Sequence, residues 1–93
     1  MDPTHYALLE EHFLRLLPAV LPVMMPSERT FTQLYFDAGE YGLALETVVD
    51  NLLRETVQVT DDTYQEIASL SALMPGVVDD QLEAVRALCQ PAN

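Results

Sequence analysis

The sequence predicts an all-α fold, in which residues 1–93 form a single domain built as a small bundle of four or five short helices. Apolar residues recur at helical spacing, and no period-2 strand of useful length, internal repeat or low-complexity tract is present. Residues that start or stop helices divide the chain into short segments. With 93 residues and 49 % apolar content, the chain can bury one core but not two.

The centre of the chain carries the clearest helix signals. Gly39 is expected to close one helix in the left-handed conformation, which costs no strain in a residue without a Cβ atom. The next helix should run from Glu40 to about Glu55, with Glu40 near its partly positive N-terminus. Its apolar stripe consists of Tyr41, Ala44, Leu45, Val48, Val49 and Leu52. Leu43 is an apolar exception on the opposite, charged side, so it should meet either another helix or a partner.

The first helix is expected to start at Asp2 or Thr4 and to end at about Leu17, because Pro18 follows. Its inward residues should be Leu9, Phe13, Leu16 and Leu17. Prolines then recur every four residues from Pro18 to Pro26, a spacing that permits short helical turns but no uninterrupted regular helix. This apolar segment is interpreted as a kinked buried connector, and the alternative is an exposed apolar docking strip.

Ser27 is the expected N-cap of the next helix, which has Glu28 in its first turn and should reach Ala38. This helix should bury some of its apolar residues, which are Phe31, Leu34, Tyr35 and Ala38. After the central helix, Val57–Val59 should form a short extended link.

Thr60 should cap a fourth helix that has Asp61 and Asp62 in its first turn and ends at Pro75–Gly76. The inner face of that helix is expected to consist of Ile67, Leu70, Leu73 and Met74. Asp79 or Asp80 should cap a last helix that Pro91 stops. The inward residues of the last helix are expected to be Leu82, Val85, Leu88 and Cys89.

The charge of the chain is strongly negative. Fifteen acidic residues stand against four arginines and no lysine, which gives a net charge of −11. Nucleic acids and anionic membranes are bound mainly through Lys and Arg side chains, so we expect neither as a direct partner of this chain. The same charge suits a basic protein, although it would also serve solubility alone.

A family resemblance appears in the central segment. The run Gly39-Glu40-Tyr41-Gly42-Leu43-Ala44-Leu45-Glu46, followed by Leu52-Leu53 and the helix start at Val59-Thr60-Asp61-Asp62, resembles the MafI-type immunity proteins of bacterial polymorphic toxin systems. The resemblance covers roughly residues 27–74. Pro18–Pro26 and Val77–Cys89 have no counterpart in the family pattern. The resemblance implies a helical antidote that binds and blocks a cognate toxin, often a nuclease, inside the cell that makes it.

The candidate contact surface is the acidic side of residues 37–55, where carboxylates would occupy the place of nucleic-acid phosphates on a basic nuclease. The residues expected to contact the partner are Asp37, Glu40, Tyr41, Leu43, Glu46, Asp50 and Glu55. Asp61, Asp62 and the C-terminal helix are rival contacts, and the acidic side could also be only a solvated face. A second hypothesis is a helical adaptor or dimerisation module that uses Pro18–Pro26. The sequence leaves the oligomeric state open.

Few residues suggest chemistry, so we expect neither an enzyme nor a cofactor. His5 and His12 lie seven residues apart, whereas metal-binding pairs on helices usually lie four apart, and the chain has no third histidine. Cys89 has the spacing of a core residue and is the only cysteine, which excludes an internal disulfide and fits a reducing cytoplasm. Neither a signal peptide nor a membrane span is expected.

Overall fold

The computed structural model describes residues 3–89, and within that range it is all-α, as the sequence predicts. The elements are α1 (Pro3–Val20), the 3-10 helix η1 (Leu21–Val23), α2 (Pro26–Asp37), α3 (Tyr41–Arg54), α4 (Asp61–Leu73), the 3-10 helix η2 (Asp79–Gln81) and α5 (Leu82–Arg86). The extended link after α3 forms a single isolated bridge between Val59 and Cys89.

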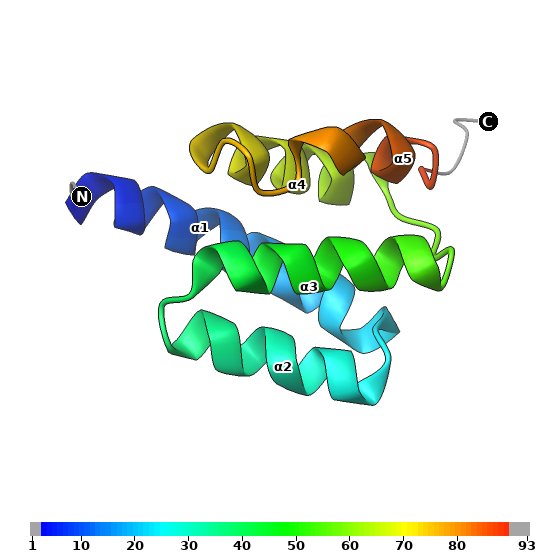
Figure 1. The fold of residues 1–93 in the computed structure, drawn as a ribbon, viewed down its shortest axis with the longest axis horizontal. Coiled ribbons are helices and arrows are strands. Elements are labelled where there is room, and N and C mark those ends of the chain that lie inside the picture. Colours follow the sequence, from blue (N-terminus) through cyan, green and yellow to red (C-terminus); the bar gives the residue numbers. More distant parts are fainter. Residues whose placement is uncertain (1–2, 90–93) are drawn as a thin grey trace.

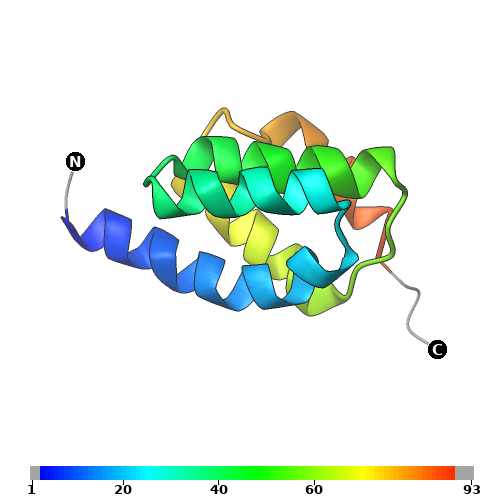
Figure 2. The same cartoon turned by 90° about the horizontal axis from the view of Figure 1, so that it is seen from below.

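The helices are arranged as two pairs that share one core. α2 packs mainly against α3, and α1 packs mainly against α4, while α5 contacts α3 and α4. In Figure 1, α4 and α5 lie at the top, α3 crosses the middle in front of α1, and α2 forms the lower edge. Seen from below, α2 lies in front of α3, and α1 runs along the lower edge of the view (Figure 2).

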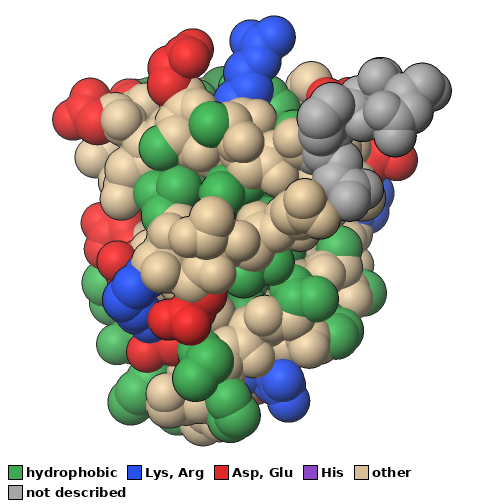
Figure 3. All heavy atoms as spheres, turned by 90° about the vertical axis from the view of Figure 1, so that its right-hand side faces the viewer, with side chains coloured by type: hydrophobic (Ala, Val, Ile, Leu, Met, Phe, Trp, Pro, Cys, Tyr) green, Lys and Arg blue, Asp and Glu red, His purple; other side chains and the backbone are tan. Residues whose placement is uncertain are grey.

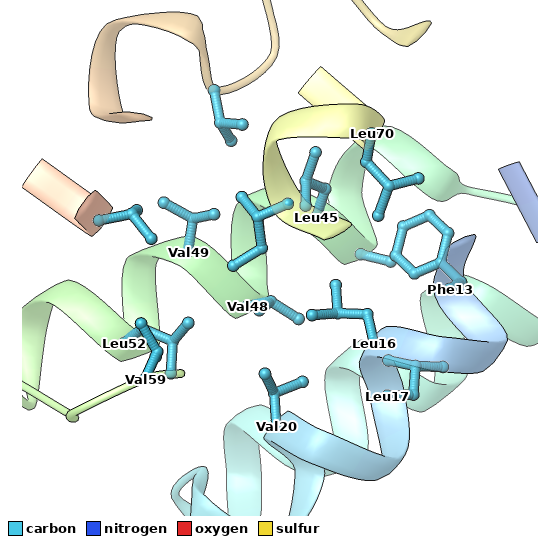
Figure 4. Packing of buried hydrophobic residues seen from close by; sticks show 14 of the residues in the cluster. Phe13, Leu16, Leu17, Val20, Leu45, Val48, Val49, Leu52, Val59 and Leu70 are labelled. Atoms are coloured by element: carbon cyan, nitrogen blue, oxygen red, sulfur yellow. The ribbon is translucent and has the colours of Figure 1, made fainter. Parts of the chain in front are cut away.

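The core lies where α1, α3 and α4 meet (Figure 4). The central stripe of α3 is buried as predicted except for Tyr41, which is partly buried, and the inward residues of α1 are buried as predicted. The largest completely buried apolar side chains are Phe13, Leu16, Leu45, Leu52, Ile67 and Leu70. Leu73 and Met74, which were expected on the same inner face as Ile67 and Leu70, are only partly buried. Burial of this apolar surface supplies most of the free energy that holds the helices together.

Gly39 joins α2 to α3 as the sequence predicts. Its φ angle is +76°, and no atom lies within 4 Å of the position that a Cβ would take. The Gly39 N–H donates to the Phe36 carbonyl at 3.0 Å and the Glu40 N–H donates to the Tyr35 carbonyl at 2.8 Å. These two bonds are the Schellman pattern that satisfies the last carbonyls of a helix. The turn therefore fixes α2 and α3 as an antiparallel hairpin.

The other end of α3 repeats this pattern without a glycine. Thr56 has a φ angle of +51°, its N–H donates to the Leu53 carbonyl at 3.3 Å, and the Val57 N–H donates to the Leu52 carbonyl at 3.0 Å. A β-branched residue in the left-handed region is strained. The hydrogen bonds and the burial of Val59 hold the chain in this turn.

Two predictions about the first half of the chain are wrong. α1 does not end before Pro18 but continues through it to Val20. Pro18 cannot donate a backbone hydrogen bond, yet it lies on the exposed side of the last turn, and continuing the helix buries Val20. Ser27 is not the N-cap of α2, because Pro26 already occupies the first helical position and Met25 precedes it as the N-cap.

The predicted inner face of α2 is also wrong in large part. Phe31 and Leu34 are exposed, Ala38 follows the helix as an exposed cap residue, and Tyr35 is only partly buried. The single buried residue of α2 is Thr32. The hairpin turn orients α2 so that Thr32 faces α3, and the apolar positions on its other side face outward. Periodicity located the apolar stripe but not the side of the helix that the bundle covers.

The second half follows the predictions more closely. Thr60 caps α4, since its hydroxyl oxygen accepts the Thr63 N–H at 3.1 Å, and Asp61 and Asp62 lie in the first turn. α4 ends before Pro75–Gly76, as expected. Of the four residues expected to face inward from the last helix, Val85 is buried, whereas Leu82, Leu88 and Cys89 are partly buried. The expected stop at Pro91 lies outside the described residues.

The expected cap of the last helix is wrong. The helix starts as η2 and continues as α5, and neither element has a side-chain cap. The Asp79 carboxylate instead accepts hydrogen bonds from the Ser71 hydroxyl at 2.7 Å and from the Gly76 N–H at 2.9 Å. These bonds, first from Ser71 and then from Gly76, lower the pKa of Asp79 below its usual value. Asp79 therefore stabilises the connection after α4 rather than the start of the next helix.

Candidate functional site

A shallow acidic groove runs beside α3. It has a volume of about 420 Å³ and is lined by Glu28 from α2, by three residues of α3, and by Val77 and Gln81 from the segment after α4. The α3 residues are Glu46, Thr47 and Asp50. They share one side of the helix because they are three, four and seven residues beyond Leu43. α2 and α3 thus bring the three carboxylates Glu28, Glu46 and Asp50 together.

Arg54 is the cation at one end of this groove. Its guanidinium forms an ion pair with Asp50, lies 3.5 Å from Glu28 Oε1 and lies 3.7 Å from Glu55 Oε2. The Arg54 side chain is about half exposed, so each of these pairs adds little to stability. One guanidinium cannot neutralise four carboxylates. The end of the molecule where α3 stops is shown in Figure 3, with acidic side chains in red and arginine side chains in blue.

The predicted contact residues divide into groups. Glu46 and Asp50 line the groove, and Glu55 joins it through Arg54. Leu43 lies on the same side of α3 and is 43 % exposed, so within residues 3–89 no helix covers it. Asp37 and Glu40 are exposed near the Gly39 turn, and Asp37 accepts a hydrogen bond from the Gln33 amide at 2.9 Å.

Tyr41 differs from the other predicted contact residues because it faces the bundle. Its hydroxyl donates to Glu10 Oε1 at 2.9 Å. The centroid of its ring lies 5.7 Å from the ring centroids of Phe13 and Phe36 and 6.1 Å from that of Tyr6. Burial, and then the hydrogen bond to the Glu10 carboxylate, raise the pKa of Tyr41. Tyr41 therefore already links α3 to α1.

Sequence reasoning missed Glu28 as a member of the acidic groove. Glu28 was expected only as a first-turn residue of α2, and its position beside Asp50 depends on how α2 folds back at Gly39. The hairpin itself was the available signal, because an antiparallel pair brings the start of α2 alongside the end of α3. Val77 and Gln81 were also missed, and no sequence signal placed them there.

A second polar cluster joins α1 to α4. Glu66 accepts from Arg15 Nε at 2.8 Å, and His12 Nδ1 lies 2.9 Å from Glu66 Oε2 and 3.0 Å from Arg15 Nη2. Burial, the largest single influence on the Glu66 carboxyl, opposes its ionisation. The hydrogen bonds from Arg15 and His12 outweigh it and lower the pKa of Glu66. The hydrogen bond to Glu66 likewise raises the pKa of Arg15. The cluster therefore has a structural role in holding the two helices together.

The remaining candidates for chemistry lie apart from one another. Cys89 is half-buried beside Val59 at the end of the described chain. In residues 3–89 no three His, Cys, Asp or Glu side chains are grouped so that they could hold a metal ion. No helix in that range has the length and hydropathy needed to cross a membrane.

Comparisons with family models, with curated proteins and with solved structures give no match. The fold and the groove define a small acidic all-α domain.

Proposed function

We propose that this chain is an immunity-type inhibitor that binds a basic protein toxin, such as a nuclease, through the acidic groove. Stoichiometric binding there would occlude or distort the active site of the toxin, and the chain itself would carry out no chemistry. The resemblance of residues 39–46 to the motif of MafI-type immunity proteins suggests this function. The inhibitor would act in the cytoplasm of the cell that makes it.

The observation that carries the proposal is the excess of carboxylates at the groove. Glu28, Glu46 and Asp50 line it, and within residues 3–89 the ion pairs of these carboxylates are those of Glu28 and Asp50 with Arg54. Nuclease active sites that hold nucleic acid are basic, and carboxylates can bind where phosphates otherwise would. The net charge of −11 adds a long-range field that speeds encounter with a basic protein.

The first test is coexpression with the C-terminal domain of the toxin encoded beside this gene. Growth rescue together with copurification of a one-to-one complex is the expected result. The absence of both growth rescue and binding would refute the immunity role. If the complex forms, its dissociation constant should rise steeply with salt, because exposed charge pairs are screened. A complex that is insensitive to salt would contradict the acidic mechanism.

A matched pair of variants tests the groove itself. Glu46→Gln with Asp50→Gln removes two charges from the groove, whereas Glu11→Gln with Glu83→Gln removes two exposed charges elsewhere. We expect the groove variant to bind the toxin domain about tenfold more weakly than the control variant, since charge pairs in contact matter more than distant charges. Equal losses in the two variants would contradict a special role of the groove, because either net charge alone or a contact through the C-terminal helix, which carries Glu83, would explain them.

The segment Pro18–Pro26 supports a second candidate, the adaptor or dimerisation module. Val20 and Met24 are buried, as expected of a connector, but Val23 is 51 % and Met25 is 48 % exposed. The segment is thus partly connector and partly open apolar surface. Self-association that is lost in Val23→Ser would favour this candidate, and an unchanged monomer would count against it.

A further inference from the structure

We propose that the outward side of α2 binds a second copy of this chain, as an antiparallel pair of α2 helices related by a two-fold axis. The surface concerned, called the outer stripe below, consists of Ser27, Phe31, Leu34 and Ala38. It differs both from the acidic groove and from the segment Pro18–Pro26. The proposal does not depend on the immunity function.

The outer stripe is an apolar helix face that the rest of residues 3–89 leaves uncovered. Phe31 is 48 % and Leu34 is 58 % exposed, and Ser27 and Ala38 are exposed as well. α2 lies at the edge of the bundle and packs mainly on α3, so its far side faces solvent (Figures 1 and 2). Two large neighbouring apolar side chains at helical spacing are a feature of interaction surfaces.

The spacing of the stripe is that of a helix-pairing seam. Ser27, Phe31, Leu34 and Ala38 follow one another at intervals of four, three and four residues. At 100° per residue they fall within an arc of about 60°, and the 4-3 alternation is what places side chains along the contact line between two packed helices.

The stripe is also complementary to itself. If two α2 helices run antiparallel about a two-fold axis midway along the stripe, Phe31 of each copy meets Leu34 of the other. Ser27 of each copy then meets Ala38 of the other. Large side chains would fill the centre, and small ones would let the helix ends approach closely. Such an isologous contact uses the same patch on both copies and closes as a dimer.

The charges beside the stripe favour a second copy over a basic partner. No stripe residue is charged, although the chain carries −11. On one flank lie Thr30 and Asp37, and on the other lie Glu28 and Tyr35. The two-fold axis brings a hydroxyl of one copy towards a carboxylate of the other on both flanks, so no two carboxylates are placed face to face. A basic protein would find no carboxylate at the centre of this surface.

The size and charge of the contact determine the expected affinity. A helix of 12 residues is only roughly 18 Å long, and one such pair buries less than a standard interface. Two copies also repel each other through their net charge. We therefore expect a dissociation constant on the order of 10 to 100 µM. Added salt should strengthen the dimer by screening this repulsion, whereas it should weaken a complex with a basic toxin.

Sedimentation of the full chain at increasing concentration and at two salt concentrations tests the proposal. We expect a monomer that converts to a dimer, more readily at high salt. Phe31→Ser with Leu34→Ser should weaken dimerisation at least tenfold, and circular dichroism should show an unchanged fold because both residues are exposed. Leu8→Ser and Val23→Ser are matched controls at other exposed apolar positions and should dimerise like the unmodified chain.

Three results would overturn the proposal. The first is a monomer up to about 1 mM, well above the expected dissociation constant. The second is a dimer that the Phe31 and Leu34 substitutions leave intact. The third is loss of the dimer in Val23→Ser alone, which would assign the interface to Pro18–Pro26. If the chain stays monomeric but the Phe31 and Leu34 substitutions abolish toxin binding, the stripe belongs to the toxin interface and the dimer proposal is wrong.

Disulfide crosslinking tests the antiparallel arrangement directly. In a Cys89→Ser background, a mixture of Ser27→Cys and Ala38→Cys chains should form a crosslinked heterodimer under mild oxidation. Each variant alone should not crosslink, because identical positions lie about 16 Å apart along an antiparallel pair. Crosslinking of each variant with itself would show a parallel pair and would contradict the proposed geometry.

Discussion

The α2–α3 pair and the α1–α4 pair are built in different ways. α2 and α3 are neighbours in the sequence, and a single tight turn at Gly39 joins them. α1 and α4 are separated by the whole hairpin, and they meet through core side chains such as Phe13 and Leu70 and through the polar cluster around Glu66. A local turn can therefore define one pair, whereas the other depends on burial and on contacts between residues more than 50 positions apart.

The two pairs also differ in how their polar groups are satisfied. Thr32 and Asn51, from α2 and α3, are completely buried, and neither Thr32 Oγ1 nor Asn51 Nδ2 has a hydrogen-bond partner within the described residues. Asn51 uses its other polar atom, Oδ1, to accept the Met25 N–H at 3.1 Å. In the α1–α4 pair the polar groups lie at the edge and bond one another. The hairpin thus buries two polar atoms without hydrogen-bond partners in residues 3–89, whereas the polar groups of the α1–α4 cluster bond one another.

The largest expected loss of stability comes from a residue that contacts both pairs of helices. Phe13 is completely buried, and its ring lies 5.4 Å from Phe36 and 5.7 Å from Tyr41, so it links α1 to the hairpin. Phe13→Ala should lower the free energy of unfolding by about 3 to 5 kcal/mol through lost burial and the cavity left behind. Chemical denaturation measures this loss. The neighbouring Leu14→Ala is the control and should change stability by less than about 0.5 kcal/mol, because Leu14 is 64 % exposed.

A smaller change in stability is expected at the unsatisfied hydroxyl in the α2–α3 hairpin. Thr32→Val replaces the unpartnered hydroxyl by a methyl group of similar size and should stabilise the protein by about 1 kcal/mol. Thermal or chemical denaturation measures the change. Thr30→Val is the matched control, since Thr30 is exposed and its hydroxyl donates to the Pro26 carbonyl at 3.1 Å. Destabilisation in Thr32→Val beyond that of the control would show that the buried hydroxyl has a partner in solution.

The smallest effect concerns the α1–α4 pair and depends on pH. The pKa of Glu66 is lower in the folded protein than its ordinary value of 4.5, because hydrogen bonds from Arg15 and His12 outweigh burial. The ionised carboxylate therefore contributes stability above pH 4.5, and this contribution is lost as the pH falls through the lower folded pKa. Glu66→Gln should be less stable than the unmodified chain near pH 7 and should lose less stability on acidification. Denaturation curves at pH 7 and pH 3 measure both effects, and parallel losses in the two chains would contradict this role of Glu66.

The sequence by itself determined that the chain is helical and where several of its helix ends lie. Gly39 adopts the predicted left-handed conformation, Thr60 caps α4 as predicted, and the α3 stripe is buried apart from Tyr41, because each depends on residues close together in the chain. The acidity of the α3 side could be read in the same way, and so two groove residues, Glu46 and Asp50, were among those predicted. Local stereochemistry and helical periodicity are contained in a short window of sequence.

Only the tertiary structure decided which side of each helix is covered. The apolar residues of α2 have a helical spacing as regular as part of the α3 stripe, yet Phe31 and Leu34 face outward because the hairpin turns Thr32 towards α3. The same turn brings Glu28 to Asp50, and it completes an acidic groove that no single helix contains. Pro18 stays inside α1 because the continued helix buries the apolar side chain of Val20. These outcomes depend on packing between distant segments, which a periodic pattern in one segment does not specify.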